Sequence, residues 1–134
     1  MILNWTPHVV RVYGPDLTLL AELPPAAYTP RLAERVEPAG SLDGLPLVRI
    51  TRDRLAAPLP VPPSGTRGVV VGDLVAPAVR AELDRIGLHD VAVLVPATGP
   101  GWAVRRTESG ELTDAPDAKG IVWGVKALNV YVKE

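Results

Sequence analysis

Two glycine-containing loops carry residue types that suit the binding of an anion. The candidate ligand-binding residues are Gly72, Asp73, Thr98, Gly99, Gly101, Arg105 and Arg106. Glycine lets backbone N–H groups approach a phosphate closely, and an arginine guanidinium holds a phosphate through two parallel hydrogen bonds. Each loop follows an apolar run that predicts a strand, and ligands of α/β sheets bind beyond the carboxyl ends of strands. One interpretation is therefore a phosphate- or nucleotide-binding protein, or a small enzyme.

The other interpretation of residues 96–101 is a simple turn that reverses the chain into Trp102. The sequence has neither the Walker spacing nor the GxGxxG pattern of specific phosphate-binding loops. The carboxylate of Asp73 would also repel an anion at the same edge of the sheet. We expect a turn here and keep the anion site as the alternative.

The sequence offers no catalytic set and no metal site. His8 and His89 lie far apart, and the chain has no cysteine, so the spacing of metal ligands is missing. Asp114 and Asp117 lack the remaining ligands of a calcium loop, and no serine stands in a GxSxG elbow. We expect neither a metal nor a cofactor, and this absence of chemistry favours a non-enzymatic protein.

Both loops depend on one strand–helix–strand unit over residues 68–96. Its apolar runs, 68–71 and 91–95, are typical of strands buried on both faces. The apolar positions between them share one helical face: Val75, Val79, Leu83 and Ile86. This spacing predicts a helix over about 73–87. A connection of that length requires two parallel strands joined by a right-handed crossover.

Other residues predict where this helix begins and ends and which side of it faces solvent. Asp73 can cap the first turn with its carboxylate, although Pro77 lacks an N–H and so favours a later start for the regular helix. Gly87 is the expected end, because glycine accepts the positive φ that follows a helix. Arg80 and Asp84 lie four residues apart on the opposite side, which we expect to be solvated.

Outside this unit the chain predicts mostly short strands and turns. The strands are expected at residues 8–13, 17–23, 31–37, 47–51, 102–107 and 121–132. A helix is the alternative for 31–37, and 38–44 has the composition of a turn. Gly124 interrupts the last strand and predicts a bulge or the close approach of another backbone. The proline-rich segment 57–66 indicates a stiff connector, with a polyproline ligand as the alternative.

Together these elements predict an α+β fold in one domain, residues 1–134. We expect a mixed, mostly antiparallel sheet or a small barrel, with one parallel crossover and one main helix. The first hairpin and the last strand should form the edges of the sheet. An exposed edge can pair with another chain, so we expect a homo-oligomer through strand edges and leave open a different protein partner.

The composition narrows the class of protein further. The net charge is −1 and the sequence pI is about 6.1, which makes nucleic acid an unlikely partner. No apolar run approaches the roughly 20 residues that cross a bilayer, and the N-terminus lacks the pattern of a signal peptide. We therefore expect a soluble cytoplasmic protein without membrane contact. Its core must be aliphatic, because phenylalanine is absent.

Several strings resemble a family of small uncharacterised proteins from bacterial and phage genomes. The matching parts are LNWTPH at Leu3–His8, the connector Leu59–Thr66, the pattern of Gly68–Ala81, Pro96–Pro100, Val104-Arg105 and Gly124–Leu128. The sequence departs from the pattern at Asp73, where a serine cap is usual, and in the longer loop 108–120. The resemblance implies a bacterial or mobile-element setting and no particular activity.

The sequence thus leads to two hypotheses about function. The first is a non-enzymatic interaction or structural module that associates with itself. The alternative is a phosphate- or nucleotide-binding protein, or a small enzyme, that uses the loops after strands 69–72 and 91–95.

Overall fold

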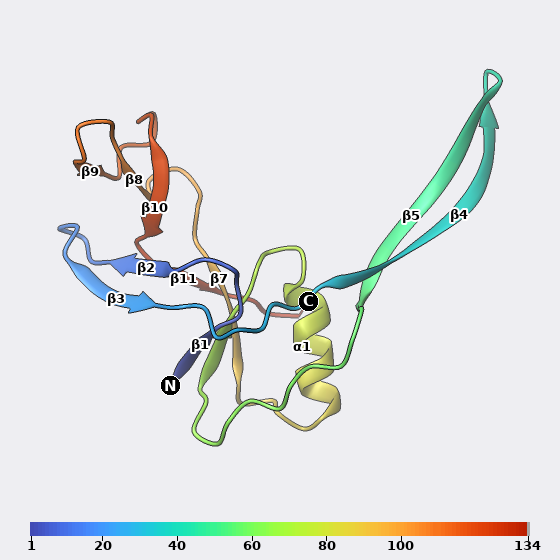
Figure 1. Ribbon diagram of the computed structural model, residues 1–134, viewed down its shortest axis with the longest axis horizontal. Coiled ribbons are helices and arrows are strands. Elements are labelled where there is room, and N and C mark those ends of the chain that lie inside the picture. The colour runs from blue at the N-terminus through green and yellow to red at the C-terminus, as the bar shows by residue number, and fades with distance from the viewer. Residues whose placement is uncertain (134) are drawn as a thin grey trace.

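The computed structural model describes residues 1–133, which form three β-sheets and one helix (Figure 1). The first sheet has the order β1 (Ile2–Asn4), β6 (Gly68–Val70), β7 (Ala92–Pro96), β11 (Leu128–Val130). The second has the order β3 (Leu19–Leu23), β2 (Val10–Tyr13), β10 (Ile121–Val125), β8 (Ala103–Arg106), β9 (Leu112–Thr113). The third contains β4 (Leu32–Leu42) and β5 (Leu45–Leu55), and α1 spans Ala76–Arg85.

The predicted strand–helix–strand unit is confirmed at the centre of the first sheet. Strands β6 and β7 are parallel neighbours, with Gly68 opposite Ala92 and Val70 opposite Leu94. Helix α1 connects them and packs on one face of the sheet (Figure 1). All three residues of β6 are buried, as the continuous apolar run predicts for a strand covered on both faces.

The core has two parts because successive residues of β6 and β7 point to opposite faces of the first sheet. Val69 and Val93 face the helix and belong to the larger cluster, together with Val79 and Leu83 of α1. The smaller cluster contains Val10, Val70 and Leu94 on the other face, where β2 of the second sheet packs. The molecule is therefore layered as helix, first sheet, second sheet.

The ends of α1 differ partly from expectation. Val75 is the N-cap residue and no side chain caps the first turn, so the predicted capping role of Asp73 is wrong. Pro77 sits within the first turn of the helix, where a missing N–H costs nothing. Gly87 follows the C-cap residue with a φ of +85°. The Leu88 N–H donates to the Leu83 carbonyl, which is the Schellman pattern expected for such an end.

The predicted single sheet or small barrel is not confirmed, because the strands are divided among three sheets. The expected last strand, residues 121–132, is in fact two strands in different sheets: β10 and β11. A further strand, β1, was not predicted and pairs in parallel with β6. Strands β3 and β11 do lie at sheet edges, as expected for the first hairpin and the end of the chain. The fold is α+β in the broad sense, with mixed sheets and mostly strands.

Gly124 has the close backbone approach that the sequence predicts. The register between β10 and β8 shifts between Val122 and Gly124, which marks a bulge. A Cβ added at Gly124 would lie 2.6 Å from Tyr13 Cε2 and 2.7 Å from the carbonyl oxygen of Arg11. Only glycine leaves room for β2 at this point, and β2 and β10 pair in parallel directly beside it.

Strands β4 and β5 form a long hairpin, here called the arm, that projects away from the rest of the molecule (Figure 1). Each strand has 11 residues, so at about 3.4 Å per residue the arm is roughly 35 Å long. The predicted turn at 38–44 is wrong over most of its length. The chain continues as β4 through Pro38 with a register shift and turns only at Asp43-Gly44.

Within residues 1–133, the single helix is too short to cross a membrane.

Candidate functional site

The two predicted loops come together at the carboxyl ends of β6 and β7, as the parallel pairing requires. A hollow of about 520 Å³ opens there, and Asp73, Thr98 and Gly99 line it together with Trp102. Gly72 precedes Asp73 in the same loop. The carboxyl-end position of the candidate site is therefore as expected from the sequence.

The two arginines of the candidate site do not line this hollow. Arg105 donates from Nη1 to the Gly120 carbonyl at 2.9 Å and borders a separate, smaller hollow that also includes Gly101. The Arg106 guanidinium lies 4.8 Å from the centre of the Trp123 ring. Among the residues that line the 520 Å³ hollow, the one charged group is the carboxylate of Asp73. Phosphate binding stays a prediction, and this arrangement gives it no support.

The LNWTPH string of the resemblance has a structural role that centres on Asn4. This side chain is 1 % exposed and makes four hydrogen bonds. Its Nδ2 donates to the carbonyls of His8 at 2.7 Å and Leu23 at 2.8 Å. Its Oδ1 accepts from the backbone N–H and the hydroxyl of Thr6, at 2.9 and 2.6 Å. Asn4 therefore joins β1, the following loop and β3.

The three tryptophans do not form one exposed cluster. Trp5 is buried in the larger core cluster and meets Tyr28 edge-on, with ring centroids 5.0 Å apart. Trp102 is half exposed beside the carboxyl-end hollow. Trp123 lies under the guanidinium groups of Arg11 and Arg106. Trp5 is thus a core residue, and its ring is not exposed for stacking on a base.

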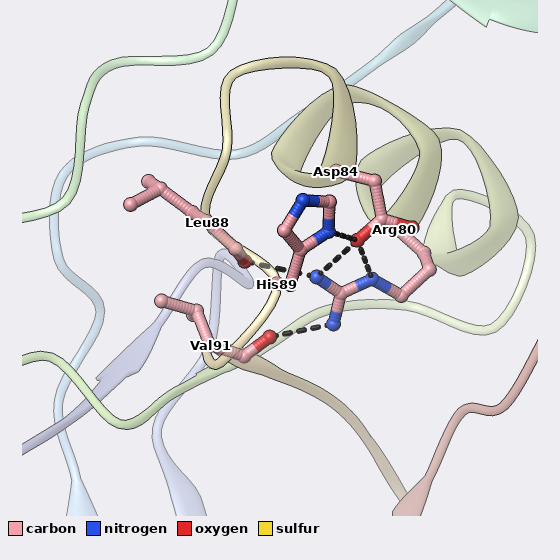
Figure 2. A network of polar contacts seen from close by, with 5 residues as sticks. All are labelled: Arg80, Asp84, Leu88, His89 and Val91. Atoms are coloured by element: carbon pink, nitrogen blue, oxygen red, sulfur yellow. Dashed lines mark hydrogen bonds and ion pairs between the residues drawn. The ribbon is translucent and has the colours of Figure 1, made fainter.

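Arg80 organises the turn between α1 and β7 (Figure 2). Its side chain is only 11 % exposed, so the predicted solvation of this helix side is wrong for Arg80. The guanidinium pairs with Asp84 at 2.9 Å and donates to the carbonyls of Leu88 at 3.0 Å and Val91 at 2.6 Å. Figure 2 shows these groups converging on the Arg80 head group. The arginine thereby binds two carbonyls of the segment that follows the helix and leads into β7.

His89 joins the same network and thereby has a structural partner. Its Nδ1 lies 3.1 Å from Oδ1 of Asp84. Desolvation raises the pKa of Asp84, but hydrogen bonds from His89 and Arg80 outweigh it and hold the pKa below its usual value of 3.8. Asp114 pairs with Lys126 at 2.7 Å, which lowers the Asp114 pKa as well. Within residues 1–133, no three metal-ligating side chains gather at one point.

The arm is the surface feature that sequence reasoning missed. One face of its middle section is apolar: Val36 lies opposite Ile50, and Pro38 lies opposite Val48. The other face is polar, where Arg35 lies opposite Thr51 and Glu37 opposite Arg49. The apolar side chains are exposed along the arm: Val36, Leu42, Leu45, Leu47, Val48 and Ile50.

The signal that identifies the arm was present in the sequence. Asp-Gly is a strong signal for a two-residue hairpin turn, and Asp43-Gly44 stands directly before the apolar-rich segment 45–50. Both residues have the positive φ of a type I′ turn, 51° and 79°. Pro38 and Gly40 hid this signal, because they also suit a turn.

Comparison of the chain with protein-family models, with curated proteins and with solved structures gave no match.

Proposed function

We propose that this protein is a non-enzymatic structural module that associates with copies of itself through the arm. The observation that carries this proposal is the exposure of nearly every residue of β4 and β5, apolar side chains included. A two-stranded hairpin alone in water is marginally stable at best, because it has no third strand or helix to cover its apolar face. An arm of this length is better explained by a partner that covers it.

The backbone of the arm supports the same function. The third sheet contains only β4 and β5, so each strand has one side without a neighbouring strand. Free N–H and C=O groups on such an edge readily accept a strand from another chain. Copies of the chain supply matching edges at β3, β11 and the arm itself.

The charge distribution agrees with a protein surface as the partner. The charged side chains of the arm are mixed in sign, and pairs such as Glu34 with Arg52 at 3.0 Å neutralise one another. Residues 32–55, which include the turn, contain four arginines and four carboxylates. The arm therefore has no excess of positive charge and lacks the electrostatic basis for binding nucleic acid. The resemblance to bacterial and phage proteins supports a bacterial or mobile-element setting for this module.

Shortening the arm should abolish self-association without unfolding the protein. The variant replaces residues 35–51 by an Asn-Gly turn, and none of the deleted residues belongs to either core cluster. Sedimentation equilibrium should give a multiple of 14.2 kDa for the full chain and a single-chain mass for the variant. Circular dichroism and thermal melting serve as the folding control.

Two outcomes would contradict the proposal. The first is that the full chain sediments as a monomer at all concentrations. The second is that the shortened variant folds and still associates as strongly as the full chain.

A further inference from the structure

The tip of the arm combines two exposed leucines with one carboxylate. Leu42 and Leu45 lie opposite each other across the Asp43-Gly44 turn and are 64 % and 67 % exposed. None of the ion pairs between the described residues involves the carboxylate of Asp43. The tip is therefore an apolar projection that carries an available negative charge.

A hollow of complementary character lies between β2 and β10, here called the β2–β10 hollow. These strands pair at a single position, Val12 with Val125, and the hollow opens where they separate. Its volume is about 220 Å³, and its wall includes Val10, Val122 and Trp123. A cavity of about 150 Å³ holds a benzene ring, so this hollow has room for a leucine side chain.

Two arginines lie against Trp123, which lines this hollow. The guanidinium groups of Arg11 and Arg106 lie 4.0 and 4.8 Å from the centre of the Trp123 ring. Arg11 is paired with Glu22 at 3.1 Å, whereas Arg106 takes part in none of the ion pairs between the described residues. A carboxylate that approaches Trp123 therefore meets an unneutralised cation.

We propose that the arm tip of one copy inserts into the β2–β10 hollow of a second copy. One of the two leucines, Leu42 or Leu45, then occupies the hollow, and Asp43 faces Arg106 beside Trp123. Apolar character and charge are complementary between the arm tip and the hollow. The inference rests on the proposed function, because it names the surface that receives the arm.

The contact must join two different copies. The arm points away from the second sheet, so its tip lies far from the β2–β10 hollow of the same chain (Figure 1). Each copy then offers its tip to one neighbour and its hollow to another, unless two copies exchange tips with each other. When each copy binds two different neighbours in this way, the contacts join unlike surfaces and build rings or filaments.

Disulfide cross-linking tests this contact cleanly because the chain has no cysteine of its own. One sample carries Leu45→Cys at the tip, and a second, tagged sample carries Val122→Cys at the hollow. A disulfide forms only when the two Cα atoms approach within about 7 Å. After mixing and mild oxidation, we expect a covalent heterodimer as the main product. Leu42→Cys provides a second tip position.

The matched control replaces the tip variant by Leu74→Cys, because Leu74 is also highly exposed but lies outside both surfaces. We expect at least a fivefold lower heterodimer yield from this control, about 1 kcal/mol in relative population at 25 °C. Equal heterodimer yields from both tip variants and the control would overturn the proposed contact between the arm tip and the β2–β10 hollow. If the full chain in that case still sediments with a mass above that of one chain, self-association stands and only the proposed contact at the β2–β10 hollow is wrong. A single-chain mass would contradict both proposals.

Discussion

Replacing Val93 by aspartate is expected to destabilise the protein strongly at neutral pH. Val93 is fully buried in β7, between neighbouring strands β6 and β11, and it faces α1 within the larger core cluster. A carboxylate at this position would have no partner, and an unpaired charge in an apolar core costs several kcal/mol. The expected loss exceeds about 4 kcal/mol, against a total stability of about 5–15 kcal/mol for ordinary domains.

The measurement for Val93→Asp is circular dichroism with a thermal scan, and Val61→Asp is the matched control. Val61 is 75 % exposed in the connector before β6, so the same charge there should leave the melting curve nearly unchanged. A cooperative transition for Val93→Asp within a few degrees of the parent protein would show that the core lies elsewhere.

Replacing Asn4 by alanine is expected to have the second largest effect. The substitution removes the Asn4 donor from the Leu23 carbonyl and the Asn4 acceptor from the Thr6 N–H. The His8 carbonyl loses Asn4 as well but keeps the Thr6 hydroxyl as a donor at 3.0 Å. Each orphaned buried group costs about 1–3 kcal/mol, so the combined loss should reach at least about 2 kcal/mol. The midpoint of urea unfolding measures this loss.

Asn129→Ala is the matched control for Asn4→Ala, because Asn129 is exposed on β11. Its unfolding midpoint should stay within the small range typical of surface substitutions, about 0.5 kcal/mol. Equal effects of the two substitutions would mean that the Asn4 hydrogen bonds do not hold β1 to β3.

The centre of the fold could be predicted because its signals are local and mutually consistent. The continuous apolar run of β6, the 3.6-residue period of α1 and the end at Gly87 all indicate one arrangement. A short connection through a helix leaves only a parallel pair of strands as the geometry. Because local propensity, hydrophobic pattern and chain connection agree here, this part of the fold can be predicted from one sequence.

The elements that were predicted wrongly or missed depend on contacts with residues far away in the chain. Strand β1 has three residues and pairs with β6, more than 60 residues later. The division of 121–132 between β10 and β11 follows from packing in two different sheets, which no local pattern reveals. In the arm, Pro38 and Gly40 suggested a turn, but a register shift between Pro38 and Ser41 accommodates them.

The candidate site was predicted in its position but not in its composition. Parallel pairing brings the loops at Asp73 and Thr98 to one hollow, as expected. The direction of Arg105 depends on its hydrogen bond to Gly120, and that of Arg106 on its contact with Trp123. Both contacts are made across the second sheet, so spacing along the sequence could not reveal them.

Amide hydrogen exchange in the arm at low and high protein concentration tests the central claim most directly. An uncovered two-stranded hairpin opens easily, so residues 32–55 should exchange quickly in the dilute protein. When copies associate at high concentration, exchange in this segment should slow strongly, while the core strands β6 and β7 stay equally protected in both samples. Identical exchange of residues 32–55 at the two concentrations would contradict self-association through the arm.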